Sequence, residues 1–310
     1  MEHKMKRIKE KKSKKKIWPW IVGSILALIL VFVGTAYYTV HKTMNKINTP
    51  LMETSETVEK EQKVITRKDP FSVLLLGVDE RENDNGRSDT MIVMTVNPEK
   101  KTMKMLSIPR DTRTEIVGYD TEDKINHAYA FGGVPMAMAT VENFLDIPLD
   151  YYVFINMEGF LKMIDTLGGV TIQNDMELTY GAYHFPEGEV NLNGEEALIF
   201  TRIRYEDPRG DFGRQIRQRQ VIEAILKKAS TPTTILKASD MLEVVGENVR
   251  MNFSMKELIQ LQGIYKKMDS GIEQIAFEEG SGTRIDDIWY YIPNEEELLK
   301  IQSELKEHLQ

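Results

Sequence analysis

A long uncharged stretch near the N-terminus constrains the fold of this chain more than any other feature. The twenty-four residues from 17 to 40 carry no formal charge, which is enough for one helix to cross about 30 Å of hydrocarbon. Aromatic residues that suit a membrane interface lie at its two ends: Trp18, Trp20, Tyr37 and Tyr38. No small-x-small cleavage pattern follows, so we expect an uncleaved signal anchor rather than a cleaved signal peptide.

Charge on either side of this stretch predicts its orientation. Residues 1–16 carry nine Lys and Arg against two Glu, whereas the whole chain has a net charge of −8. Because positive charge marks the cytoplasmic side of a span, we expect a single-pass type II protein of the cell membrane. Its N-terminus would be cytoplasmic and the domain after the span extracellular. The body after the tail is strongly acidic, which argues against a nucleic-acid partner, because such binding depends on phosphate neutralisation.

The chain divides into four predicted parts. Residues 1–16 form a basic cytoplasmic tail, 17–40 a transmembrane helix, 41–69 a polar stalk and 70–310 the folded domain, whose main motifs lie within 71–230. Short apolar runs alternate there with amphipathic segments. We expect strands at 71–78, 91–96, 102–108, 151–155 and 170–172, and helices at 133–145, 157–167, 194–200, 211–229, 255–268 and 294–309. This alternation predicts an α/β fold, an αβα sandwich with a central mixed β-sheet flanked by helices.

Arginine is distributed unevenly in the predicted domain. Six of the fourteen arginines, and no lysine, lie in the run RIRYEDPRGDFGRQIRQR at 202–219. Four more lie between 81 and 113, and none between 114 and 201. A guanidinium group can grip a phosphate through two parallel hydrogen bonds, whereas a merely solvated basic surface would mix lysine with arginine. The pattern therefore predicts a site for a phosphorylated ligand, assembled from two distant parts of the chain.

The second arginine window predicts two local arrangements. Arg202 and Arg204 are alternate residues, so they share a face if this segment is extended. Arg214, Arg217 and Gln218 share one face at the start of the predicted helix. A helix N-terminus favours anions, so arginines on its first turn conflict with the usual preference for acidic residues there. Such a local conflict is typical of a functional site.

Other residues of this window have plainer interpretations. Asp211 is the expected N-cap of the helix. A second hypothesis is that Asp211, or a nearby carboxylate, helps to deprotonate an acceptor hydroxyl. Arg209 and Arg219 are expected to face solvent, and Arg217 is left undecided between the site and the surface.

The loop after the first predicted strand carries two carboxylates that suit a metal ion. In GVDERENDNGRSDT, residues 77–90, Asp79 follows one strand and Asp89 precedes the next. Carboxylates at neighbouring strand ends are good ligands for Mg²⁺, or Mn²⁺ in its place, which also accepts phosphate oxygens. An acidic turn is the alternative, and an EF-hand alignment fails at its first and last ligand positions. Arg81 and Arg87 lie between the acids, which favours a pyrophosphate site.

A third segment, SIPRDTR at 107–113, places Arg110 at the end of the predicted hairpin, where Pro109 fixes the turn. Taken alone, an arginine at a strand end is more often part of a surface ion pair. The five histidines lack metal-ligand spacing, and the sequence contains no nucleophile elbow, Walker loop or dinucleotide fingerprint.

Several long motifs, in order, resemble the LytR–CpsA–Psr family. They are LLLGVDER, GRSDT, SIPRDTR, DKINHAYAFGG, NMEGFLKMIDTLGGV and LNGEEALIFTRIRYEDPRGDFGRQIRQRQ. The resemblance is close over residues 71 to about 230, and the family layout of a short cytoplasmic tail and one membrane anchor matches throughout.

The resemblance implies a phosphotransferase on the outer face of the membrane. Its donor would be an anionic glycopolymer, most simply wall teichoic acid, carried on polyprenyl pyrophosphate, and its acceptor a sugar hydroxyl of peptidoglycan. Asp79 and Asp89 would hold the metal ion, and the apolar face of the sheet would take the lipid. The implied pyrophosphate ligands are Arg81, Arg87, Arg110, Arg202, Arg204, Arg214 and Gln218. Arg81, Arg110 and Asp211 would take part in catalysis.

Two other functions use the same sequence features. A membrane-bound regulator or transcription attenuator would have to act through the sixteen-residue tail, which has no design for nucleic acid. A lipid-pyrophosphate pyrophosphatase would use the same site, with water replacing the sugar hydroxyl, and the sequence leaves this alternative open.

Overall fold

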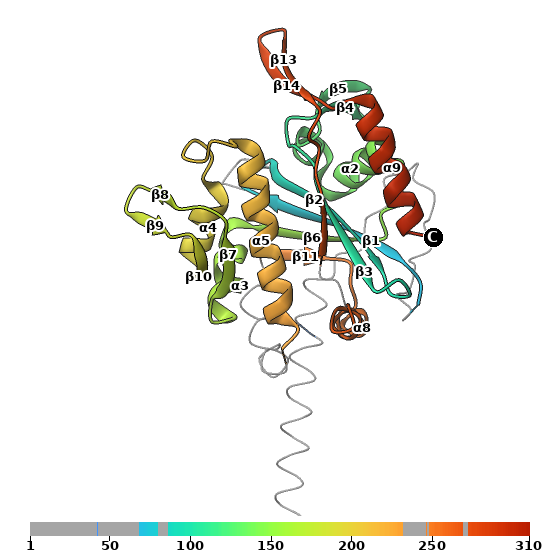
Figure 1. The fold of residues 1–310 in the computed structure, drawn as a ribbon. Helices are drawn as coiled ribbons and strands as arrows, with labels where there is room; N and C mark the ends of the chain where they lie inside the picture. The colour runs from blue at the N-terminus through green and yellow to red at the C-terminus, as the bar shows by residue number, and fades with distance from the viewer. Residues whose placement is uncertain (1–41, 43–67, 80–85, 232–245, 247, 269–271) are drawn as a thin grey trace, which may run out of the picture. The chain divides into compact units, whose positions relative to one another are not determined.

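The computed structural model (Figure 1) describes residues 42, 68–79, 86–231, 246, 248–268 and 272–310. Among these residues, no helix has the length and apolar character needed to cross a membrane. The predicted anchor at 17–40 and nearly all of the predicted stalk lie outside the described residues, so both stay predictions.

A six-stranded mixed sheet forms the centre of the domain, in the order β11-β6-β1-β2-β3-β12. Its strands are β1 (Phe71–Val78), β2 (Ser88–Asn97), β3 (Thr102–Ser107), β6 (Tyr151–Asn156), β11 (Val249–Met251) and β12 (Ile272–Ile275). β1 pairs antiparallel with β2 and parallel with β6, and β2 and β3 form the predicted antiparallel hairpin. The expected central mixed sheet is therefore confirmed.

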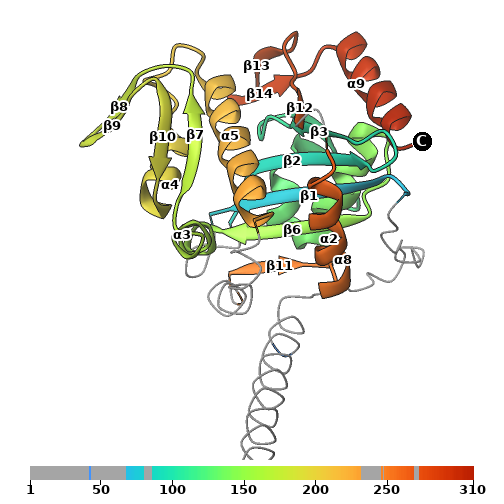
Figure 2. The same ribbon diagram turned by 60° about the horizontal axis from the view of Figure 1, so that its bottom comes forward.

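Helices cover both faces of this sheet (Figure 2). On one face, α2 (His127–Leu145) and α9 (Glu295–His308) pack on β1, and Leu74, Leu76 and Leu305 share a core that is almost fully buried. Burying each such side chain contributes about 1.5–3 kcal/mol. On the other face lie α5 (Asp211–Ala229) and α8 (Met255–Tyr265). The hydroxyl of Tyr151 on β6 donates to Glu257 of α8 at 2.8 Å.

A second, smaller layer packs against the far side of α5. It contains α3 (Met157–Thr166), α4 (Gly194–Arg202), the ribbon β7 (Val170–Asn174) with β10 (Gly188–Leu192), and the hairpin β8 (Leu178–Tyr180) with β9 (Tyr183–Phe185). Its core includes Phe200 and Ile203, and Val221 of α5 joins it. Asn193 begins α4 with the expected cap, here a complete capping box.

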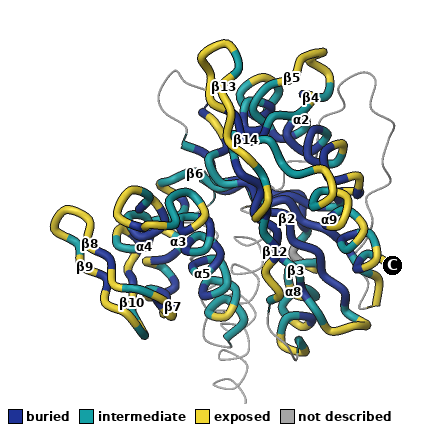
Figure 3. The backbone as a smooth tube through the Cα atoms, turned by 45° about the horizontal axis from the view of Figure 1, so that its top comes forward, coloured by how far each residue is buried: buried dark blue, intermediate teal, exposed yellow. Residues whose placement is uncertain are grey.

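Two short ribbons complete the described part of the chain. They are β4 (Arg113–Ile116) with β5 (Thr121–Lys124), and β13 (Ser281–Ile285) with β14 (Ile288–Ile292). Figure 3 shows the central strands buried and the turns of the β13 and β8–β9 hairpins exposed. The sequence analysis assigned no element to these ribbons, because their strands are short and largely exposed.

Helix α5 has the predicted bounds, and it buries polar and charged side chains as well as apolar ones. Val221 is buried, and so are Gln215, Arg217 and Arg219. Because α5 lies between the sheet and the smaller layer, both of its sides are covered. A stripe pattern assumes that one side of a helix faces water.

Candidate active site

The site forms where β1 ends and β2 begins, and Arg110 is its link to the sheet. Arg110 follows β3, and its Nη1 donates to Asp89 Oδ1 at 2.7 Å, which joins the first arginine window to the predicted metal ligand. Burial lowers the pKa of Arg110, but the negative charges of Asp89, Asp111 and Asp211 outweigh it and raise that pKa above its usual value. Asp211 belongs to α5, so the two distant arginine windows converge here as predicted.

Asp79 lies directly after β1, at the same end of the sheet as Asp89. Val78 pairs with Ser88, so Asp79 follows the end of β1 and Asp89 lies at the start of the neighbouring strand. Asp89 is the second residue of β2 rather than the residue before it, so the strand begins earlier than predicted. Gly86 lies close against the end of β1, because it has φ +69° and a Cβ at this position would lie 2.8 Å from the carbonyl oxygen of Asp79. Only glycine accepts this backbone conformation without strain at such close approach.

Arg202 and Arg204 reach the site from the end of α4 rather than from an extended segment. Arg202 is the last residue of α4, and Ile203 caps the helix, so the predicted extended segment is wrong. Arg202 Nη2 lies 4.0 Å from Asp79 Oδ2, and Arg204 Nε lies 3.8 Å from Asp211 Oδ1. These separations exceed hydrogen-bond length, so both guanidinium groups stand beside carboxylates without being tightly bound to them.

The prediction that Asp211 is the N-cap of α5 is wrong. Gly210 is the N-cap, and no side chain closes a capping bond. Asp211 is instead the first helical residue, and its carboxylate contacts Arg214 Nη2 at 2.6 Å and accepts from Gln215 Nε2 at 3.0 Å. Neighbouring cations and an amide therefore use the oxygens that would otherwise accept from the backbone.

Arg214 is the most constrained cation of the site. Its side chain is 11% exposed, and its Nε is buried without a hydrogen-bond partner among the described residues. Burial lowers the pKa of Arg214; Asp211 and Asp89 oppose this shift, while the nearby charges of Arg110 and Arg204 add to it. An unsatisfied buried donor costs about 1–3 kcal/mol, which makes Arg214 a candidate for binding an anion.

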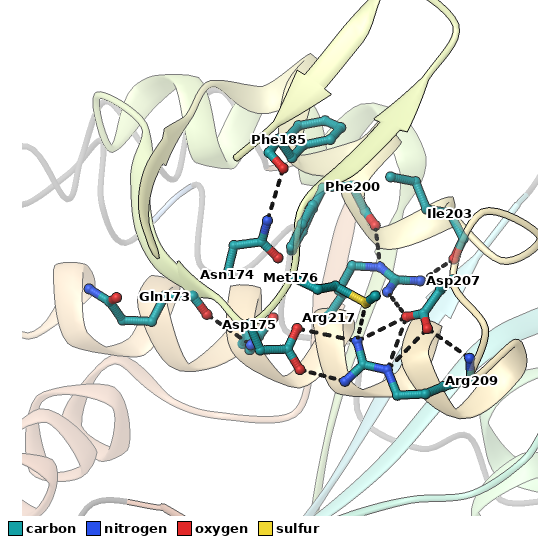
Figure 4. A network of polar contacts seen from close by, with 11 residues as sticks. Gln173, Asn174, Asp175, Met176, Phe185, Phe200, Ile203, Asp207, Arg209 and Arg217 are labelled. Carbon is teal, nitrogen blue, oxygen red and sulfur yellow. Dashed lines mark hydrogen bonds and ion pairs between the residues drawn. The ribbon is translucent and has the colours of Figure 1, made fainter. Parts of the chain in front are cut away.

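Arg217, left undecided from the sequence, is part of the framework (Figure 4). Its side chain is fully buried, and its three nitrogens donate to the carboxylate of Asp207 and to the backbone carbonyls of Phe200 and Ile203. These bonds fasten the end of α4 and the segment leading to Arg204. Gly213 permits the packing, because a Cβ there would lie 1.9 Å from Asp207 Oδ2.

The expectation that Arg209 and Arg219 face solvent is wrong. Arg219 is 4% exposed and donates to Ser107 Oγ at 2.9 Å and Gln274 Oε1 at 2.8 Å, which ties α5 to β3 and β12. Arg209 is partly exposed but bonds Asp207 through Nε at 3.0 Å and pairs with Asp175 (Figure 4). The sequence placed both positions at the surface. It could not show that residues of the smaller layer and of the sheet edge would contact them.

Two residues that the sequence analysis did not single out extend the site. Asp111 lies 3.6 Å from Arg110 Nε, and its other oxygen lies 2.8 Å from Lys124 Nζ. Asp111 directly follows Arg110 in SIPRDTR, and Lys124 belongs to DKINHAYAFGG. The sequence therefore held a signal for both residues, because SIPRDTR and DKINHAYAFGG are among the motifs that carry the family resemblance.

The remaining predicted ligands differ in how far the structure places them. Arg87 is exposed just before β2, and Gln218 is partly buried one turn beyond Arg214 on α5. Arg81 lies outside the described residues. Among those that are described, no group of three or more His, Cys, Asp or Glu is arranged to hold a metal, so Asp79 and Asp89 could hold an ion only together with other ligands.

Comparison with known proteins gives consistent matches over nearly the whole chain. The model of the LytR_cpsA_psr family matches residues 34–307. A Bacillus subtilis strain 168 protein, polyisoprenyl-teichoic acid–peptidoglycan teichoic acid transferase TagU, is 47% identical over 98% of this chain and 99% of its own length.

Solved structures agree with this match. The crystal structure of Bacillus subtilis TagU has a TM-score of 0.66 at 49% identity, and the match covers 78% of this chain and 98% of that one. A structure of TagT bound to LIIa-WTA has a TM-score of 0.70 at 32% identity over 84% of this chain and 99% of that one. The resemblance inferred from the motifs is confirmed.

Proposed function

The chain belongs to the LytR–CpsA–Psr family, and we propose that it moves an anionic glycopolymer, wall teichoic acid, from polyprenyl pyrophosphate onto peptidoglycan. The relatives named as teichoic acid transferases support this assignment, and so does the solved structure of TagT bound to LIIa-WTA. The chain is accordingly an enzyme of the transferase class.

One observation carries the proposal: the buried, unpartnered Nε of Arg214 within a cluster of arginines. Arg110 and Arg204 lie close enough to lower its pKa, so three positive charges meet around Asp211. A pyrophosphate offers several anionic oxygens and would satisfy guanidinium donors from both arginine windows at once. The proposed ligand set also includes Arg202, which lies 4.0 Å from Asp79, together with Arg81, Arg87 and Gln218.

The proposed reaction requires little from the protein beyond position and charge. The acceptor oxygen forms a bond to the phosphorus that carries the glycopolymer, and the bridging P–O bond breaks, so polyprenyl phosphate leaves with that electron pair. Guanidinium groups stabilise the charge that develops on the transferring and leaving oxygens. We propose that the carboxylate of Asp211, between Arg204 and Arg214, accepts the proton of the attacking hydroxyl.

Asp79 and Asp89 fit a divalent ion that is shared with the substrate. Their side chains are 27% and 33% exposed and lie at neighbouring strand ends. Mg²⁺ retains waters and combines one or two carboxylates with phosphate oxygens, so two protein ligands suffice. When bound, Mg²⁺ or Mn²⁺ would neutralise charge on the pyrophosphate.

We also propose that residues 17–40 anchor the enzyme in the cell membrane with its domain outside. Donor and enzyme would then diffuse in one plane, and the apolar face of the sheet would receive the lipid. In this arrangement the tail plays no part in catalysis. Deleting residues 2–14 should leave transfer intact, whereas a regulator acting through the tail would fail.

The direct test combines the full chain in detergent with a lipid-linked teichoic acid precursor, peptidoglycan oligosaccharides and Mg²⁺. We expect a covalent polymer–peptidoglycan product, detected by mass, whose yield falls with EDTA and returns with Mg²⁺ or Mn²⁺. Polyprenyl phosphate released without that product would show a pyrophosphatase instead. No product and no release under any metal condition would refute both enzymatic readings.

A further inference from the structure

A cavity of about 270 Å³ lies beside the arginine cluster, between the first two turns of α5 and the chain that follows β12. Its wall contains Phe212, Gln215, Ile216, Arg219, Ala276 and Glu278. The α5 members are spaced along one side of the helix, apart from Arg214. The cavity is therefore a different space from the cluster in which the pyrophosphate is proposed to bind.

Gln215 connects the cavity with the proposed reaction centre. It is 6% exposed, forms part of the cavity wall, and donates through Nε2 to Asp211 Oδ2 at 3.0 Å. The other oxygen of Asp211 lies 2.6 Å from Arg214 and 3.8 Å from Arg204. The carboxylate proposed to accept the proton thus stands between the wall of the cavity and the arginines.

The composition of the wall restricts the occupant. Glu278 would repel a pyrophosphate, and the charged groups of Glu278 and Arg219 make the cavity a poor place for an isoprenoid chain. Phe212 is 39% exposed and offers a ring face on which the C–H surface of a sugar can pack. Gln215, Arg219 and Glu278 add donors and acceptors for hydroxyl and amide groups. The volume lies below the about 300 Å³ at which pockets for drug-sized ligands begin.

We propose that this cavity binds the acceptor sugar, the residue of the peptidoglycan glycan whose hydroxyl attacks the donor. This inference rests on the proposed function and adds where the acceptor is held. A sugar seated there would lie next to Gln215, which bonds Asp211, and so beside the arginines that are proposed to bind the pyrophosphate. Holding the acceptor hydroxyl near both its base and the donor makes the transfer an effectively unimolecular step.

The test uses the full chain and three substitutions. Phe212→Ala removes the ring face, Ala276→Leu fills the cavity, and Glu278→Gln removes the carboxylate. Glu279→Gln is the matched control, since Glu279 is the adjacent exposed carboxylate and is absent from the cavity wall. KM is measured separately for the peptidoglycan oligosaccharide and for the lipid-linked donor, and circular dichroism checks the fold of each variant.

We expect the first three substitutions to raise the acceptor KM by about tenfold, with the donor KM unchanged and the control like wild type. An unchanged acceptor KM in folded Phe212→Ala and Ala276→Leu would overturn the proposal. A rise in donor KM instead would also overturn it, because the cavity would then hold part of the donor.

A binding measurement keeps this test separate from the proposed function. The disaccharide N-acetylglucosaminyl-N-acetylmuramic acid is titrated into wild type and Ala276→Leu and followed by isothermal calorimetry. Binding to wild type that weakens about tenfold in the variant would support the cavity even if no transfer were observed. Equal binding to both would reject the cavity even if transfer occurred.

Discussion

Two groups of arginines come from the same eighteen residues and end in different surroundings. Arg217 is fully buried with all three nitrogens bonded to Asp207 and backbone carbonyls. Arg214, three residues earlier, is almost as buried but leaves its Nε without a partner among the described residues. Burial alone therefore does not distinguish a framework arginine, which holds the fold, from a site arginine. The distinguishing feature is whether the protein satisfies all of its hydrogen-bond donors.

Position along α5 produces this division. Arg217 meets the smaller layer, where helix α4 ends in free carbonyl groups and Asp207 supplies a counter-charge. Arg214 meets the end of the central sheet, where the neighbouring charges of Arg110 and Arg204 add to the lowering of its pKa by burial. The framework arginines hold the loop that carries Arg204, so the two groups depend on each other.

Removing a framework arginine should produce the largest effect. Arg217→Met leaves Asp207, whose side chain is 0% exposed, with the partly exposed Arg209 as its remaining cationic partner. It also leaves the buried carbonyl oxygens of Phe200 and Ile203 without the donor from Arg217. We expect a loss of about 3–5 kcal/mol in the free energy of unfolding, measured by urea denaturation. The matched control is Arg204→Met, which should change stability by less than about 0.5 kcal/mol. Equal losses in the two variants would remove the distinction between the groups.

Removing a site arginine should affect turnover and leave stability nearly unchanged. Arg110→Ala is expected to lower kcat by about 10²–10³-fold, as loss of one preorganised donor does. Arg110→Lys should recover only part of this, because it restores the charge without the planar fork. Arg284→Ala, on the exposed β13 ribbon, should behave as wild type. Full activity in folded Arg110→Ala would place Arg110 outside the site.

The buried ion pair between Asp207 and Arg217 should also make the stability of the protein depend on pH. Burial alone would raise the pKa of Asp207, but hydrogen bonds from Arg209 and Arg217 outweigh it and lower that pKa to about 2 from 3.8. The stabilisation is therefore complete above pH 3.8 and is lost as pH falls through about 2.

Its size follows from the shift, at about 2 kcal/mol. The gap in unfolding free energy between wild type and Asp207→Asn should narrow by this amount from pH 5 to pH 2. A gap that stays constant over this range would show that Asp207 is not held by its arginines.

Local structure was largely predictable from the sequence, because its signals are local. The bounds of α5 and the cap at Asn193 were found from residues adjacent in the chain. The β2–β3 hairpin and the strand β1 follow from apolar runs separated by a turn. These elements were sufficient to predict a central mixed sheet with helices on both faces.

The division of the arginines was not predictable in the same way. Helical spacing placed Arg214, Arg217 and Gln218 on one side, but it could not show that the carboxylate of Asp207 would lie within reach of Arg217. Arg219 depends on Ser107 and Gln274, which are far away in the sequence. Such contacts require the tertiary arrangement. The sequence therefore predicted that arginines gather in this region. It did not predict which of them are bonded to the protein itself.

Arg209 gives the smallest expected effect and the sharpest test of the division, because it belongs fully to neither group. Its side chain is 32% exposed, yet it bonds Asp207 and pairs with Asp175, and the bonds to Asp175 and then Asp207 raise its pKa. Arg209→Ala leaves Asp207 bonded to Arg217, so no charge is stranded. We expect a loss of about 1 kcal/mol with kcat unchanged. A loss near that of Arg217→Met would show that the network around Asp207 acts as one unit, in which the burial of each arginine does not matter.

A coupling energy between Arg209→Ala and Asp175→Ala of about 0.5 kcal/mol or more would show that the exposed end of the network still contributes to stability.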